Sequence, residues 1–150
     1  MTRTVRHSRL RSVARIALGA ALVFAGTSHL TFAREDFQAQ VPSWVPLDVD
    51  AVVVASGVVE ICLGLLLVCL PRHQRQLGLL AAVFFVAVFP GNIAQLTEHR
   101  DAFGLDTDTK RALRLLGQPV LVAWAWWSTR TPPAATARTR TGTAHVTVAR

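Results

Sequence analysis

Four polar residues that could bind a ligand or carry a proton lie inside long apolar stretches of the chain. They are His29, Glu60, Asn92 and Gln118, one in each of four stretches. A polar group in hydrocarbon is costly to leave unpaired, so such a residue faces a partner, a cavity or a ligand. Four helices could bring these side chains together, which makes them a candidate ligand-binding cluster.

Two more polar residues join this cluster by helical spacing. Ser56 lies one turn before Glu60, and Arg114 lies one turn before Gln118. The Arg114 side chain can extend to the membrane interface, or its guanidinium can reach Glu60, and the spacing leaves both open. We identify no catalytic residue and no metal site in the sequence.

The third stretch contains Phe89-Pro90-Gly91-Asn92, where proline removes a backbone hydrogen-bond donor. Asn92 and Gln95 can supply a substitute donor to the carbonyl left free, or Asn92 can face a ligand. The same choice applies to the whole cluster, which can bind a ligand or only stabilise the packing of the helices. Both alternatives stay open on the sequence.

The apolar stretches themselves predict the fold. The chain has 150 residues, of which 51% are hydrophobic, and each stretch approaches the roughly 20 residues that cross a bilayer. We expect an all-α fold, a four-helix bundle of transmembrane helices within residues 13–128, with crossings at 13–32, 50–70, 77–96 and 112–128. The first stretch also resembles a signal peptide ending near Ala33, but it is longer than the apolar core of such a peptide.

Arginine residues predict the orientation of the bundle. They gather in the N-terminal tail 1–12, in the turn between the second and third crossings and in the C-terminal tail 129–150, whereas the other two loops are acidic or mixed. Both termini are therefore expected in the cytoplasm, in a multi-pass protein of the plasma membrane. The tail 129–150 has the composition of a disordered segment. We interpret the formal net charge of +7 as serving topology and contact with the lipid bilayer, not binding of nucleic acid.

Helical rise places the cluster beneath the outer face of the membrane. At 1.5 Å per residue, His29 and Asn92 lie about 5 Å from the outer ends of their crossings. Gln118 lies about 9 Å deep and Glu60 about 15 Å deep. These side chains would line a funnel that opens outward and suits a polar headgroup, a quinone-like carbonyl or a proton path. The amphipathic first outer loop, residues 37–46, can cover the funnel or only anchor the chain at the membrane surface.

Five short motifs, taken in order, resemble those of the DoxX-like small membrane proteins. They are Gly26-x-x-His29, the stretch from Phe37 through Val41-Pro42-x-x-x-Pro46, Ser56-Gly57-x-x-Glu60, Phe89-Pro90-Gly91-Asn92 and Arg114-x-x-x-Gln118. The resemblance runs from Arg15 to Ser128. Leu30 and Ala33 stand where that family commonly has phenylalanine and proline, and these departures concern the entry into the first outer loop.

The resemblance implies a non-catalytic membrane subunit or docking partner of a redox or quinone-linked system. Its partner would be a membrane or periplasmic-side oxidoreductase, and the molecule held would be a quinone. The sequence has one histidine within a crossing, no CxxC and no nucleotide-binding loop, so we do not expect the chain to be an enzyme by itself. A small transporter or proton-coupled permease and a structural membrane scaffold remain as alternatives, and the chain can also form a homo-oligomer.

Overall fold

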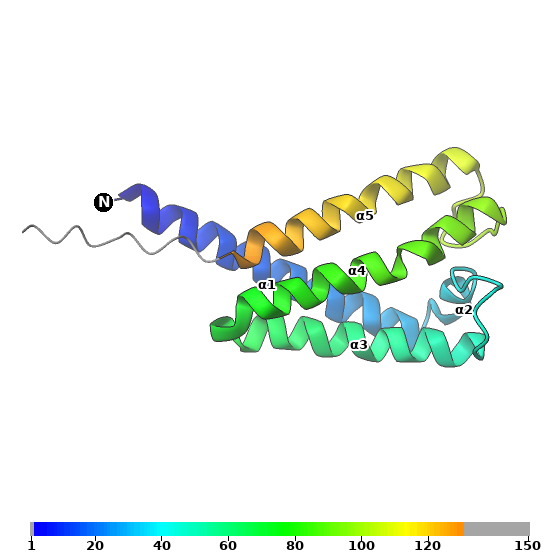
Figure 1. Ribbon diagram of the computed structural model, residues 1–150, viewed down its shortest axis with the longest axis horizontal. Helices are drawn as coiled ribbons and strands as arrows, with labels where there is room; N and C mark the ends of the chain where they lie inside the picture. Colours follow the sequence, from blue (N-terminus) through cyan, green and yellow to red (C-terminus); the bar gives the residue numbers. More distant parts are fainter. Residues whose placement is uncertain (1, 131–150) are drawn as a thin grey trace, which may run out of the picture.

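The computed structural model describes residues 2–130, with side chains from residue 9 onward, and consists of helices joined by short connections. In chain order they are α1 (Thr2–Leu30), α2 (Arg34–Gln38), α3 (Val49–Cys69), the 3₁₀ turn η1 (Pro71–His73), α4 (Gln74–Thr97) and α5 (Asp108–Thr129). No strand occurs in this part of the chain. Figure 1 shows the long helices α1, α3, α4 and α5 running along one axis, with α2 at one end. The predicted all-α class is confirmed.

Three helices of the described region are long and apolar enough to cross a membrane. They span Arg9–Leu30, Val49–Cys69 and Pro71–Thr97. These segments coincide closely with the first three predicted crossings and indicate a membrane protein. The fourth predicted crossing, 112–128, lies within α5 and is not one of these three segments. Arg114 and Gln118 make this stretch less apolar than the other three.

The ends of the chain differ from the expected division into tails and bundle. α1 begins at Thr2, so the helix extends back through most of the segment 1–12 that was predicted as a tail. At the other end, Thr129 is the last residue of α5 and Arg130 follows it. The remainder of the predicted disordered tail 129–150 lies outside the described residues.

Glycines allow α1 and α3 to pack closely. Gly19 faces Gly64 and Gly26 faces Gly57, and in each helix the two glycines are two turns apart on one face. A Cβ atom on Gly19 would lie 2.7 Å from the carbonyl oxygen of Gly64, and one on Gly57 would lie 2.9 Å from that of Gly26. Only very small residues permit such an approach between membrane helices. The crossing brings the last turns of α1 beside the middle of α3.

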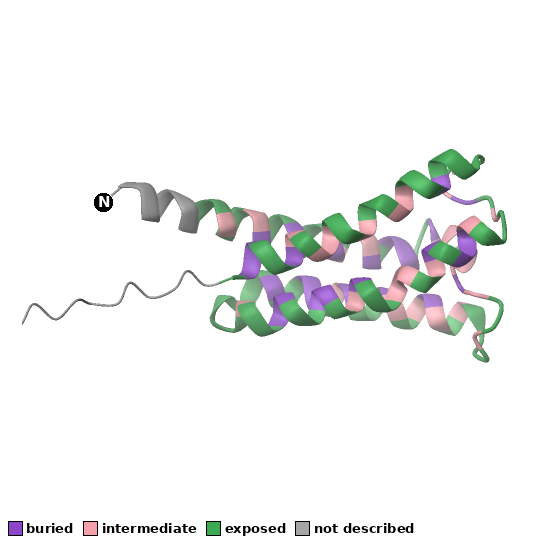
Figure 2. Cartoon of the chain, turned by 45° about the horizontal axis from the view of Figure 1, so that its top comes forward, coloured by how far each residue is buried: buried purple, intermediate pink, exposed green. Residues whose placement is uncertain are grey.

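An apolar core fills the half of the bundle away from α2. Its buried residues come from all four long helices and are Leu18, Leu22, Leu63, Leu67, Leu77, Ala81, Ala82, Phe85 and Ala125. At the same end, Nε1 of Trp124 donates a hydrogen bond to the carbonyl oxygen of Ala14 at 3.0 Å, which ties α5 to α1. Figure 2 shows exposed residues along the outer faces of the helices, and many of them are large and apolar. Such a surface suits surrounding lipid.

The two loops at the α2 end contact each other and the helices. Arg34 on α2 forms a bidentate pair with Asp50 at the start of α3, in which Nε donates to Oδ1 at 2.6 Å. Arg100, in the loop between α4 and α5, donates from Nη1 to the carbonyl oxygen of Val41 at 2.8 Å. These contacts join both loops into one cover over this end of the bundle.

Candidate functional site

A pocket with a volume of about 440 Å³ lies at the α2 end, beneath the joined loops. It is lined by every residue of the predicted cluster: His29 from α1, Ser56 and Glu60 from α3, Asn92 from α4, and Arg114 and Gln118 from α5. The rest of the lining is mainly apolar and comes from the same helices and from the first loop. Its size is within the range of small-molecule sites, which is roughly 300–1,000 Å³. Among the residues described, no group of three or more His, Cys, Asp or Glu side chains could hold a metal ion.

His29 and Glu60 meet at the α1–α3 crossing, and both line the pocket. Nδ1 of His29 lies 3.2 Å from Oε2 of Glu60 and 3.4 Å from Oγ of Ser56. The two residues are 6% and 8% exposed. The glycine contact explains this closeness, because a Cβ on Gly57 would lie 2.7 Å from the Cβ of His29. The side chain that contacts Glu60 is thus that of His29. The interpretation in which the Arg114 guanidinium reaches Glu60 is wrong.

Three polar atoms around the pocket have no hydrogen-bond partner. In the described region, the buried side-chain atoms of this kind are Arg15 Nε, Glu60 Oε2, Asn92 Oδ1 and Gln118 Oε1. Glu60 Oε2 is among them because its contact with His29 has the distance but not the angles of a hydrogen bond. The last three atoms belong to residues that line one pocket. Since buried polar atoms are nearly always paired, the pocket offers hydrogen bonds to a molecule that enters it.

Aromatic rings cover the pocket. Phe37 meets the His29 ring edge-on, and its ring centroid lies 4.6 Å from that of Phe103. The guanidinium carbon of Arg114 lies 4.5 Å from the centre of the Phe103 ring, a cation–π contact. The first loop contributes residues from Phe37 to Val45 to the lining. It therefore covers the pocket, which was one of the two roles that the sequence allowed for this loop. The sequence analysis did not identify Phe103 as part of the site. The one indication in the sequence was an aromatic residue among the charged residues of this loop.

Arg114 contacts this aromatic cover and the first loop. Its Nη1 donates to Oε1 of Gln40 at 2.8 Å when the Gln40 amide has its oxygen toward the guanidinium. The opposite orientation directs Nε2 of Gln40 to Oε1 of Gln95 at 3.5 Å. The first orientation is preferred, because it gives a charged donor an acceptor at the shorter distance. Gln95 donates to the carbonyl oxygen of Arg100 at 3.5 Å, and so it supports the loop and not the backbone before Pro90.

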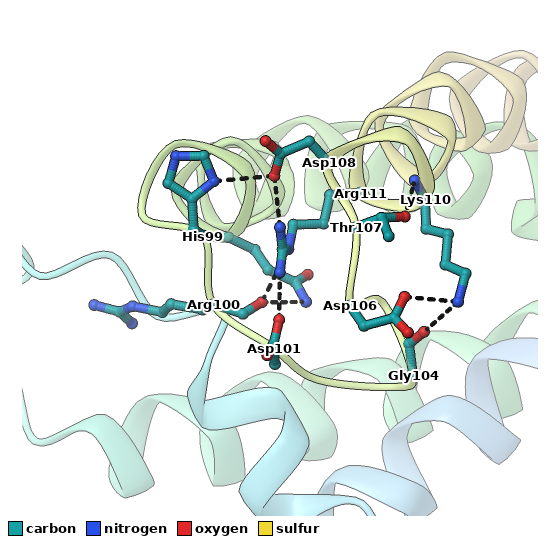
Figure 3. A network of polar contacts seen from close by, with 10 residues as sticks. His99, Arg100, Asp101, Gly104, Asp106, Thr107, Asp108, Lys110 and Arg111 are labelled. Carbon is teal, nitrogen blue, oxygen red and sulfur yellow. Dashed lines mark hydrogen bonds and ion pairs between the residues drawn. The ribbon is translucent and has the colours of Figure 1, made fainter.

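A polar network holds the loop 98–107 in place beside the pocket (Figure 3). Arg111, which is 5% exposed, forms ion pairs with Asp101 and Asp108. Nδ1 of His99 lies 3.0 Å from Oδ1 of Asp108. The hydrogen bond from His99, together with that from Arg111, holds the pKa of Asp108 below its usual range. Arg111 was also missed in the sequence, where it was one of several charges around the start of α5.

Comparison with known proteins identifies a family without an assigned activity. A family model described as "Domain of unknown function (DUF8561)" matches residues 18–129. The matched region includes every residue that lines the pocket, and with them all six predicted site residues. No curated protein and no solved structure matches the chain.

Proposed function

Since this chain belongs to the DUF8561 family, whose function is unknown, we propose its role from the pocket: it is a non-catalytic membrane subunit that holds a hydrogen-bond-donating head group. The observation that carries this proposal is the set of unpartnered oxygens on Glu60, Asn92 and Gln118 around one pocket. A carboxylate accepts hydrogen bonds, and each amide can present an oxygen or an N–H group. A head group with hydroxyl donors, such as that of a quinol, matches this set.

The charges in the pocket favour an uncharged head group. Glu60 contributes a carboxyl group and Arg114 contributes a guanidinium, so the acidic and basic groups balance. An anionic head group bound near His29 would also face the carboxyl group of Glu60. Taking a further charge into a largely apolar pocket also carries a desolvation penalty. A neutral ligand avoids both costs.

The redox role rests on the five motifs that resemble the DoxX-like proteins. On this proposal, an oxidoreductase in the membrane or on its outer side would use the molecule that the pocket holds. The chain itself would bind and present that molecule and would not react with it, since the sequence has no CxxC and no nucleotide-binding loop. A small transporter and a structural scaffold are the competing functions.

We further propose that α5 is a fourth crossing and that both termini are cytoplasmic. α5 has 22 residues, which is long enough to cross a ~30 Å hydrocarbon layer. The guanidinium of Arg130 lies 4.6 Å from the Trp126 ring at its end, an arrangement typical of a membrane interface. Two arginines in the first half of α1 lie at the same end, because Arg11 donates to the carbonyl oxygen of Arg130 and Arg15 donates to that of Val68, close to η1. The pocket would therefore open toward the outer face of the plasma membrane.

Affinity purification in lipid nanodiscs or mild detergent tests the function. All copurifying lipids, quinones and proteins are identified by mass spectrometry, for the wild type, for Asn92→Leu and for Gln76→Leu. Asn92 lines the pocket, whereas Gln76 is exposed at the opposite end of α4 and serves as the matched control. We expect a quinone or similar amphiphile with the wild type and with Gln76→Leu, and a several-fold loss with Asn92→Leu. A wild-type protein without such a ligand would favour the scaffold, and flux through proteoliposomes that depends on Glu60 would favour the transporter.

A further inference from the structure

A second cavity, here called the α4–α5 groove, lies between α4 and α5. Its volume is about 540 Å³, and its lining includes Val86 and Phe89 from α4 and Val122, Ala123 and Trp126 from α5. Val86 is 59% exposed and Trp126 is 48% exposed, so the groove opens on the outer surface of the bundle. In a membrane this surface faces lipid. The groove is therefore accessible from the hydrocarbon layer.

The α4–α5 groove adjoins the polar pocket. Phe85 and Gln118 line both cavities. Gln118 is also one of the residues with an unpartnered buried oxygen. Phe85 and Gln118 thus form the boundary between the two cavities. Polar groups that could bind a head group lie on the pocket side, and an almost wholly apolar lining lies on the groove side. A polar pocket next to an apolar groove matches a molecule with a polar head and an apolar chain.

Helical spacing makes the groove elongated. On α4 its lining recurs from Ala82 to Phe89, and on α5 it recurs from Pro119 to Trp126. Each set covers one face of its helix over seven residues, which corresponds to a length of about 10 Å. Two facing apolar tracks of this length suit an extended hydrocarbon chain better than a compact molecule.

We propose that the α4–α5 groove binds the hydrocarbon chain of the same amphiphile whose head group occupies the polar pocket. The inference rests on the proposed function and adds the class of ligand: an uncharged, hydroxyl-bearing head group attached to a long apolar chain. It also adds the route of entry, which is lateral, from the bilayer between α4 and α5. Gln118 then lies where head and chain join.

Photocrosslinking of the full chain in nanodiscs tests this placement. The probe is an alkyl hydroquinone with a diazirine in its chain, and a second probe carries the same chain on a glycerol head group. We expect the label to concentrate on the groove residues of α4 and α5. Excess unlabelled hydroquinone should reduce the labelling at these residues more than elsewhere. Leu79 and Leu65 are exposed elsewhere on the bundle and report the background labelling by bulk lipid. The probe that labels the groove more strongly identifies the preferred head group, and either preference supports the proposal.

Variants that fill the groove provide the decisive comparison. Ala123→Phe adds a ring to its lining, and Val86→Trp does so from the exposed side of α4, which keeps the test available if one variant fails to fold. We expect each to reduce groove labelling several-fold. Ala55→Phe makes the same change on the exposed face of α3, outside both cavities, and should leave the labelling unchanged. Labelling spread evenly over exposed residues, or unchanged in both filled variants, would overturn the inference.

The same variants separate this inference from the proposed function. If Asn92→Leu reduces ligand recovery while Ala123→Phe and Val86→Trp affect neither recovery nor labelling, the head-group site stands and the groove assignment fails. If none of the three variants changes recovery or labelling, both proposals fail. Loss of recovery in the pocket variant together with loss of labelling in the filled variants supports both.

Discussion

Nδ1 of His29 lies 3.2 Å from Oε2 of Glu60, across the crossing of α1 and α3. The contact exists because Gly26 and Gly57 bring the backbones of α1 and α3 together at this level. Both residues also line the polar pocket. Helix packing and pocket chemistry therefore depend on the same few residues, and substitutions at the crossing should affect both.

Two substitutions of Glu60 distinguish hydrogen bonding from packing. Glu60→Gln retains the shape of the side chain and keeps a hydrogen-bonding group beside Nδ1 of His29, whereas Glu60→Leu leaves the buried imidazole without this polar neighbour. An unpaired buried polar group costs about 1–3 kcal/mol, so we expect Glu60→Leu to lower the free energy of unfolding by about that much more than Glu60→Gln. Denaturant unfolding in detergent micelles measures the difference. Equal losses would contradict a hydrogen-bonding role for Glu60.

The α1–α3 crossing is tested by adding a single methyl group. In Gly57→Ala the new Cβ would lie 2.7 Å from the Cβ of His29, so the helices must separate. Overpacking of this kind costs roughly 1–3 kcal/mol of unfolding free energy, and it should also reduce ligand recovery by displacing His29. The matched control is Gly117→Ala, where a Cβ meets nothing within 4 Å. The control should be neutral, or stabilising by about 0.5–1 kcal/mol through helix propensity, and a similar loss in both variants would refute the packing argument.

Removal of Phe103 should uncover the pocket. Phe103→Ala deletes a ring that contacts both Phe37 and Arg114. The cation–π contact alone is worth about 0.5–2 kcal/mol, which corresponds to as much as roughly 30-fold in an equilibrium constant. We expect faster chemical modification of Arg114 by an arginine reagent, followed by peptide mass spectrometry, and faster release of bound ligand. Phe32→Ala removes a ring that is 76% exposed and serves as the control; the two variants should not behave alike.

The polar network of the loop 98–107 should weaken in acid. Because His99 and Arg111 hold the pKa of Asp108 below its usual range, the folded state binds a proton at this carboxyl group less readily than the unfolded state. The resulting stabilisation is complete above the ordinary aspartate pKa of about 3.9 and is lost as pH falls through the lower folded value. Hydrogen exchange of the loop amides, corrected for the intrinsic effect of pH, should show this loss of protection. In Asp108→Asn the loop amides should be less protected at neutral pH, and their protection should change less as the pH falls. A pH profile identical to that of the wild type would argue against the network.

The approximate positions of the four long helices could be predicted from the residues alone, although α1 and α5 begin earlier than the predicted crossings. An apolar stretch in lipid must satisfy its backbone hydrogen bonds internally, so its length dictates a helix. The predicted second crossing at 50–70 corresponds to α3 at Val49–Cys69 for this reason. The inward placement of polar residues follows from the same physics, since Glu60 or Asn92 on a lipid-facing surface would be unpaired. All six predicted residues accordingly line one pocket.

Contacts between helices and loops required the folded chain. Spacing along α5 places Arg114 and Gln118 on one face, but it carries no information about which loop lies above them. The loop reverses through left-handed backbone at Phe103 and Gly104, with φ of 56° and 67°, and this turn brings the Phe103 ring over Arg114. The partner of Glu60 depended in the same way on the distance between two helices, and the α4–α5 groove depended on how two apolar faces diverge. Local patterns are properties of one element, whereas these relationships arise from the mutual packing of several.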